Sequence, residues 1–374
     1  MQFGIISEIQ PGPEPWEPGA EARLYRETLD QVVRGEEVGF DYAWLVEHHF
    51  LTGYSSSSAP EAFLGWLAAH TSRIRLGHGV VQVNPPTNHV LRIAERAAVL
   101  DIISEGRLDV GMGRALTHIE LEAFGMDPAY TRRAQEEVVD ILHGIWSGDR
   151  FSWKGEHYTL PEVRVHPRPV QSPHPPLWMA ATQPGSLQVA ARKGLGVLAL
   201  GLGSPDLLRQ PIADYRETVA GAAPASGAVN NQVAAAIPMF CAETDEEALE
   251  TFGPHLDTFF AYVADYIIGP WRNTESESYS FYRNLASDRL IDLPTLTPDQ
   301  VAGLSPAAAA AKAGVLSGFF CVGSPETCAQ CVERWRDIGV DQLVLNCQLG
   351  TLPHESILRS LDLFGQEVMP RFEV

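Results

Sequence analysis

The sequence predicts an α/β protein folded as a TIM barrel, in which eight parallel strands alternate with helices. Eight short apolar segments occur along the 374 residues, and each is followed by a segment with helical periodicity. The apolar segments are continuous rather than alternating, as expected for parallel strands that are covered on both faces. A doubly wound open sheet shows the same alternation, so the residues leave that second architecture open.

The elements follow one another along the whole chain. The expected strands lie at 1–7, 42–48, 74–83, 107–113, 176–182, 196–201, 232–242 and 341–348. The expected helices lie at 23–40, 60–71, 89–104, 132–148, 185–194, 205–220, 244–263, 324–338 and 353–368. The first helix places Tyr25, Leu29 and Val32 on one face, and Gly39 ends it. In the helix at 324–338, Ser324 and Pro325 suit the N-cap and the first helical position.

A barrel of this type needs about 250 residues, so we expect one domain spanning 1–374 with two insertions. The first, at about 150–176, predicts a hairpin that turns at Lys154-Gly155, followed by a proline-rich return. The second, at 264–318, is long and irregular and ends in an alanine run. Such long connections are often functional, so we expect either a lid over the site or an ordinary surface loop.

Composition excludes several classes of protein. The net charge of −20 argues against binding to nucleic acid and to anionic membranes. No run of 18 apolar residues and no signal-like N-terminus is found, so we expect a cytoplasmic protein. The five cysteines do not form a secreted disulfide pattern. Cys328 and Cys331 form a CxxC pair without a second ligand pair, so we predict no metal site.

The segment "VEHHF" places Glu47, His48 and His49 at the end of the second expected strand. Active sites of TIM barrels lie at this end of the strands. Side chains alternate along a strand, so both histidines face the barrel axis only if the strand has already ended. The residues alone leave acid–base chemistry, metal binding and simple packing open.

A resemblance to a known family favours acid–base chemistry. "FDYAWLVEHHF" resembles the second strand of the bacterial luciferase-like flavin monooxygenase family. The likeness continues through "LGHGVVQVNPPTNHVLRIAERAAVLDIISEGRLDVGMGRALTHIELEAFGMD", then at "PLWMAATQPGSLQVAARKG", "VGSPETC", "GVDQLVLNCQLG" and "LDLFGQEVMPRF". These segments keep the order of the family across nearly the whole chain.

The resemblance implies a TIM barrel that binds reduced FMN. His48 matches a histidine that assists proton transfer beside the flavin, and Glu47 and His49 are its neighbours in the motif. Arg114 matches an arginine that contacts the flavin phosphate. These matches predict an active site built from the ends of the second and fourth strands.

Two further segments complete the expected flavin site. Thr182, Gln183, Gly185 and Ser186 fall in the turn that the family uses for the phosphate. Gly79 and Val80 match a non-proline cis peptide that packs against the flavin ring. Gly113 stands where luciferase has a reactive cysteine, which puts light emission in doubt and leaves flavin binding as the expectation.

The resemblance also implies a reaction. An NAD(P)H:flavin reductase would supply FMNH₂, because the chain lacks a dinucleotide-binding loop. O₂ would then oxidise a small organic substrate through a flavin 4a-(hydro)peroxide, in a homodimer. Three alternatives remain: a deazaflavin-dependent hydride-transfer enzyme of the same superfamily, a non-catalytic flavin-binding homologue, and a metal-dependent hydrolase using His48, His49, His78 or His89.

Overall fold

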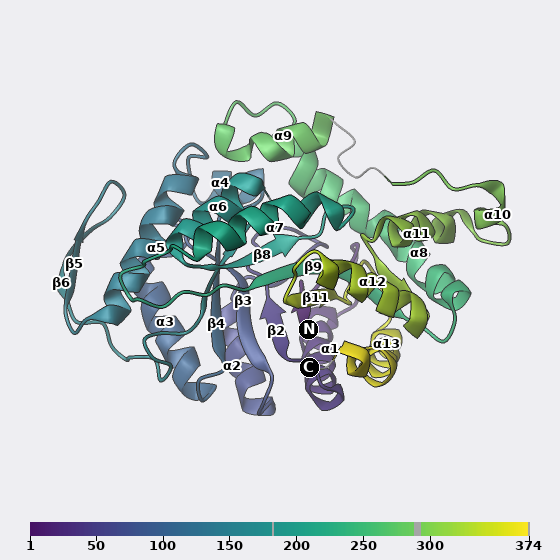
Figure 1. Ribbon diagram of the computed structural model, residues 1–374, viewed down its shortest axis with the longest axis horizontal. Coiled ribbons are helices and arrows are strands. Elements are labelled where there is room, and N and C mark those ends of the chain that lie inside the picture. The colour runs from purple at the N-terminus through teal and green to yellow at the C-terminus, as the bar shows by residue number, and fades with distance from the viewer. Residues whose placement is uncertain (182, 288–292, 373–374) are drawn as a thin grey trace.

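The computed structural model describes residues 1–181, 183–287 and 293–372, and it contains a closed barrel of eight parallel strands (Figure 1). The strands are β1 (Gln2–Ser7), β2 (Tyr42–Leu45), β3 (Arg75–Gln82), β4 (Leu108–Gly113), β7 (Leu177–Ala180), β8 (Gly196–Leu200), β9 (Val233–Cys241) and β11 (Gln342–Asn346). They pair in this order, and β11 pairs with β1 to close the ring. The predicted TIM barrel is therefore confirmed, and the open sheet is excluded.

Helices surround the barrel. They are α1 (Ala20–Val38), α2 (Pro60–His70), α3 (Val90–Ile103), α4 (His118–Ala123), α5 (Thr131–Ser147), α6 (Pro184–Lys193), α7 (Asp206–Val219), α8 (Asp245–Tyr262), α12 (Pro325–Asp337) and α13 (His354–Glu367), with the 3₁₀ turn η4 (Met369–Phe372). A three-residue strand, β10 (Cys321–Gly323), pairs with β9 outside the ring. β10 was not predicted from the sequence, because three residues are too few to show a period.

The segment at 150–176 forms an antiparallel hairpin of β5 (Phe151–Lys154) and β6 (Thr159–Val163), which extends from the barrel (Figure 1). Glu137 of α5 anchors it: its carboxylate accepts hydrogen bonds from Trp153 Nε1 at 2.7 Å and from the backbone N–H of Tyr158 at 3.0 Å.

The described part of 264–318, which leaves out 288–292, is mostly helical. It contains the π-helix η1 (Val263–Ile268), the 3₁₀ turns η2 (Gly269–Trp271) and η3 (Glu277–Tyr279), and the helices α9 (Ser280–Ser287), α10 (Pro298–Val301) and α11 (Pro306–Ser317). The alanine run forms α11, which packs closely on α8, where Gly253 lies against the backbone of Ala307 and Ala308. The irregular connection expected from the sequence is thus a set of short helices.

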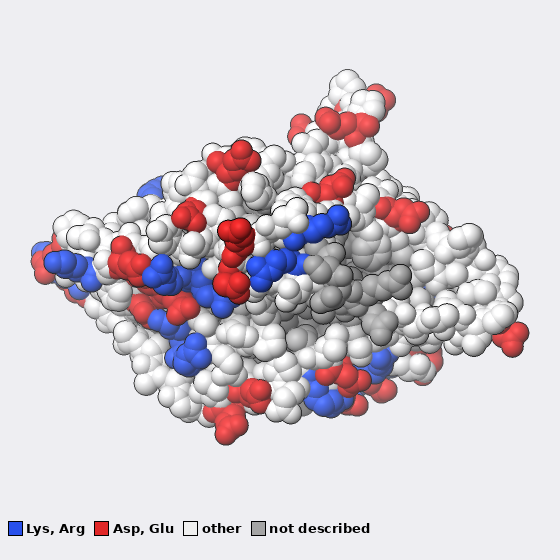
Figure 2. Space-filling model, turned by 90° about the horizontal axis from the view of Figure 1, so that it is seen from above, with Lys and Arg blue, Asp and Glu red and all other residues white. Residues whose placement is uncertain are grey.

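Charges of both signs are interspersed on the face seen in Figure 2, and no broad basic surface is present there. Among the described residues, no helix is both long and apolar enough to cross a bilayer.

Two tryptophans belong to a small apolar cluster inside the barrel. Trp44 and Trp178 pack edge to face, with ring centroids 5.4 Å apart. Their ring nitrogens donate to Gln342 Oε1 and Asp109 Oδ1, each at 2.8 Å. The Trp44 ring has room because the neighbouring strand carries Gly77, where a Cβ atom would lie 2.2 Å from the ring.

We expect Gly77→Ala to lower the free energy of unfolding by about 1–3 kcal/mol, because the added methyl group forces Trp44 out of its packed position. Urea-induced unfolding checks this value. Gly65→Ala, within α2, is the control, because its Cβ would lie 3.6 Å from Ile103 of α3, an ordinary contact distance. That control should raise stability by about 0.5–1 kcal/mol. Equal effects of the two substitutions would contradict the packing argument.

Candidate active site

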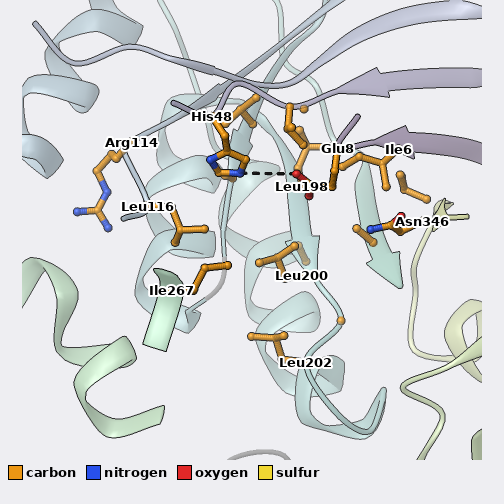
Figure 3. Close-up of a pocket in the computed structure, with 18 of the residues that line it drawn as sticks. Ile6, Glu8, His48, Arg114, Leu116, Leu198, Leu200, Leu202, Ile267 and Asn346 are labelled. Carbon is orange, nitrogen blue, oxygen red and sulfur yellow. Dashed lines mark ion pairs between the residues drawn. The ribbon is translucent and has the colours of Figure 1, made fainter. Parts of the chain in front are cut away.

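A cavity of about 260 Å³ opens at the carboxyl ends of the barrel strands. Glu8 follows β1, His48 follows β2 and Arg114 follows β4, so residues from separate strand ends meet in its wall. Figure 3 shows His48 and Glu8 at one end and the aliphatic side chains of Leu198, Leu200 and Leu202 below them. The cavity thus lies where TIM barrels place their active sites.

His48 is held between two carboxylates. Its Nδ1 lies 3.3 Å from Glu120 Oε1, and its Nε2 lies 3.9 Å from Glu8 Oε2 (Figure 3). Strand β2 ends at Leu45, so His48 and His49 lie beyond the pleat, and the alternation rule does not constrain them. The His48 side chain is only 11% exposed, so these contacts are made largely out of water.

The carboxylates set the protonation of His48. Burial alone lowers the pKa of His48, but the hydrogen bond and charge of Glu120, together with Glu8 and Glu47, raise it to about 9. Burial alone raises the pKa of Glu120, but His48 and the other hydrogen-bond donors lower it to about 2. Burial also raises the pKa of Glu8, although His48 opposes this effect. At neutral pH the pair is therefore imidazolium and carboxylate.

Glu120 was not among the predicted site residues. Its Oε1 accepts hydrogen bonds from Gln82 Nε2 at 2.6 Å and from the backbone N–H of His49 at 3.0 Å. Its Oε2 accepts from the hydroxyl of Thr117 at 2.8 Å. The spacing Thr117-x-x-Glu120 is a capping-box signal, and the structure contains that capping box at the start of α4. The signal identifies a helix start, but it does not indicate contact with a histidine 72 residues away.

Glu47 and His49 form a second, adjacent pair. His49 Nε2 lies 3.0 Å from Glu47 Oε1, which also accepts from Asn88 Nδ2 at 2.9 Å. Glu47 Oε2 accepts from the backbone N–H of Gln82 at 2.7 Å, which ties the end of β2 to the end of β3. Glu47 lines the cavity, whereas the His49 ring packs against Phe124, with ring centroids 4.9 Å apart. The structure therefore places His48 and Glu47 at the cavity, whereas the His49 ring contacts Glu47 and Phe124.

Two arginines lie in another part of the cavity wall. Arg114 donates to Thr131 Oγ1 and to the Ser278 carbonyl, each at 3.1 Å, and its guanidinium lies 4.8 Å from the centre of the Tyr279 ring. Arg132, which sequence analysis missed, also lines the cavity. Burial and then the charge of Arg114 lower the pKa of Arg132. Arg132 lies in the first turn of α5, where the helix dipole disfavours a cation. An arginine at a predicted helix start is therefore the one feature of the sequence that could have indicated a ligand-binding role.

The predicted phosphate turn lies at the start of α6. Gln183 is the N-cap and Ser186 is in the first turn, where it lines the cavity. Gly185 lies in the same turn with open space at its Cβ position. Thr182 is outside the described residues. The helix start and the arginines thus border one cavity.

The peptide bond between Gly79 and Val80 is cis, as predicted. Both residues lie within β3, at an irregularity in its pairing with β4, and both line the cavity.

The residues that the structure describes contain no group of three or more histidine, cysteine or acidic side chains arranged for a metal ion. His89, one of the histidines considered for a metal site, instead accepts the N–H of Leu91 and caps α3. All five cysteines are free and buried.

Comparisons with known proteins give relatives of two kinds. The oxygenase component of flavin-dependent trigonelline monooxygenase from Acinetobacter baylyi is 34% identical over 47% of this chain and 48% of that protein. An F420-dependent glucose-6-phosphate dehydrogenase from Kineococcus radiotolerans is 28% identical over 91% of each chain. The chain spans about half the length of the first curated relatives it matches.

Among solved structures, monooxygenase RslO1 from Streptomyces bottropensis is similar over 100% of both chains, with a TM-score of 0.79 and 26% identity. The sequence profile described as luciferase-like monooxygenase matches residues 1–342. The chain therefore belongs to the luciferase-like monooxygenase family, an oxidoreductase family that contains both FMN-dependent monooxygenases and F420-dependent dehydrogenases.

Proposed function

We propose that the protein is the oxygenase component of a two-component monooxygenase. It binds FMNH₂ supplied by a separate NAD(P)H:flavin reductase and oxidises a small organic substrate with O₂. The observation that carries the proposal is the buried His48–Glu120 pair at one end of a cavity that has two arginines elsewhere in its wall. The similarity to RslO1 and to trigonelline monooxygenase supports the monooxygenase assignment.

The residues present fit an FMN phosphate. Arg114 and Arg132 lie close enough for the charge of one to lower the pKa of the other. A bound anion would offset this repulsion, and a guanidinium forms paired hydrogen bonds to phosphate. The two hydrogen bonds of Arg114 leave further N–H donors for such a ligand. The first turn of α6, with Ser186, adds a hydroxyl and the positive end of a helix dipole.

His48 is proposed as the group that holds and transfers a proton. When bound, reduced FMN supplies the electrons for the reaction with O₂. Because Nδ1 of His48 is bonded to Glu120, its proton-bearing Nε2 is directed towards Glu8, which also lines the cavity. Ile267, Tyr279 and Tyr282 of the 264–318 insertion also line the cavity, where they exclude water from this proton. Glu120 acts through His48 and is therefore a positioning residue.

A homodimer is proposed from the resemblance and from one surface feature. Val99, Ile102 and Ile103 are exposed on α3, and Val170 is exposed in a nearby loop beside Gly106. Exposed apolar groups of this kind often mark an interface.

The second candidate function is F420-dependent hydride transfer, which the full-length similarity to a glucose-6-phosphate dehydrogenase favours. An anaerobic titration monitored by fluorescence distinguishes the two. We expect FMNH₂ to bind at least tenfold more tightly than reduced F420. Tighter binding of F420, with hydride transfer from it, would replace the proposed function by the second one.

The phosphate assignment is checked by a matched pair of neighbouring arginines. Arg132→Met should weaken FMN binding at least tenfold, because a cation beside the phosphate is lost. Arg133→Met should leave it unchanged, because Arg133 is exposed and pairs with Glu156. Riboflavin, which lacks the phosphate, should bind both variants and the wild type equally. If Arg132→Met weakens FMN and riboflavin to the same degree, the contact is not with the phosphate.

His48→Gln should lower substrate turnover at least 100-fold, because a general acid–base group typically contributes a factor of 10²–10⁴. FMN binding should change less than about threefold, since the phosphate contacts remain. Product formation with a flavin reductase measures turnover, and flavin fluorescence measures binding. His70→Gln, on the exposed end of α2, is the control. Unchanged turnover of His48→Gln, measured on any accepted substrate, refutes the role of His48.

A further inference from the structure

The cavity contains a continuous aliphatic wall. Leu198 and Leu200 lie two residues apart on β8 and therefore share one face of the strand, and Leu202 follows the strand end. All three line the cavity (Figure 3). Leu200 is 41% exposed, although it lies at the end of a barrel strand. Phe259, Phe260 and Val263 add further apolar lining from α8 and η1. Apolar surface left open in this way favours an apolar occupant.

One end of this wall is polar. Glu8 is 8% exposed, and among the described residues its Oε2 has no hydrogen-bond partner. The nearest charged group is His48 Nε2 at 3.9 Å. Tyr54 lies beside the Glu8 carboxylate and lowers the pKa of Glu8, against the larger effect of burial. A buried acceptor without a donor is costly, so the remaining oxygen is suited to a donor on a ligand.

The charges around this end disfavour an anionic ligand. Glu8, Glu47 and Glu120 surround His48, so an anion would meet three carboxylates and one imidazolium. A cation would be attracted by the carboxylates and repelled by the charged His48 ring. Either ion would also lose its hydration against the leucine wall, which is costly without a full counter-charge.

We propose, on the basis of the monooxygenase function above, that the substrate is a neutral, mainly hydrocarbon molecule with one O–H or N–H group. Its apolar part lies along Leu198, Leu200 and Leu202, and its O–H or N–H group donates a hydrogen bond to Glu8 Oε2 beside His48. Glu8 is thus a specificity-determining residue, and sequence analysis did not identify it.

The test uses three probes that share a 4-butylphenyl group and differ in the polar substituent, measured by isothermal titration calorimetry with saturating FMN and without it. They are 4-butylphenol, 4-butylanisole and 4-butylbenzoate. The phenol should bind at least tenfold more tightly than the anisole, a difference of about 1.4 kcal/mol, and the benzoate should bind most weakly. Glu8→Gln should reduce the preference for phenol over anisole to within about threefold, because the amide lacks the charge that strengthens the hydrogen bond.

Leu200→Asp should weaken binding of all three probes at least tenfold, because a charge replaces the aliphatic wall. The controls are Leu207→Asp, at a position 62% exposed on α7, and Glu333→Gln, on the exposed surface of α12. Both should change affinities less than twofold. Thermal unfolding verifies that each variant is folded. If Glu8→Gln does not fold, Leu200→Asp still tests the binding site.

The outcomes separate this inference from the proposed function. Equal affinity for phenol and anisole, or tightest binding of the benzoate, overturns the inference even when FMN binds normally. If the wild type shows the phenol preference but binds no FMN in either redox state, the proposed function fails and the recognition by Glu8 stands. If Glu8→Gln keeps the full preference, the donor is recognised elsewhere and the assignment to Glu8 is wrong.

Discussion

Keeping a charged imidazole inside an apolar cavity is the constraint on which the site depends. His48 stays protonated because the Glu120 carboxylate lies 3.3 Å away, and Glu120 stays ionised because Gln82, Thr117 and the backbone of His49 donate to it. Breaking a buried pair of this kind costs about 3–5 kcal/mol, since it leaves a charge without compensation. The partners follow β2, end β3 and follow β4, so only the closed barrel holds them at these distances.

The barrel and the position of His48 could be predicted because their signals are local. Each of these patterns spans only a few consecutive residues: the apolar runs of the strands, the glycines that end helices and the motif "VEHHF". Glu8, Glu120 and Arg132 carry no such signal for function. Glu120 meets His48 across 72 residues of sequence, and its local pattern equally describes an ordinary helix cap. Their roles depend on which strand ends become neighbours, and no periodicity encodes that.

The insertion after α8 is part of the site rather than an appendage. Tyr279 stacks on Trp271, with ring centroids 4.0 Å apart, and its hydroxyl donates to the Ala115 carbonyl at 2.8 Å. Trp271 Nε1 donates to the Leu116 carbonyl at 2.9 Å. Both acceptors directly follow Arg114, which itself donates to Ser278. The backbone that positions Arg114 is therefore fixed from the insertion, and a displacement of the insertion also displaces the proposed phosphate contact.

The charged side chains of the cavity determine the orientation of a bound ligand, which the apolar walls alone do not. Hydrophobic contact is not directional, so a flat ring against Val80 gains similar free energy in several orientations. Arg114 and Arg132 stand in one part of the wall, and Glu8, Glu47 and Glu120 surround His48 in another. A ligand with an anionic tail is favoured with that tail at the arginines, because the reverse orientation places it among carboxylates. The chain has a net charge of −20, and the two neighbouring arginines form a local positive region in it. This difference in charge favours the orientation in which the end of the ligand opposite the anionic tail lies beside His48.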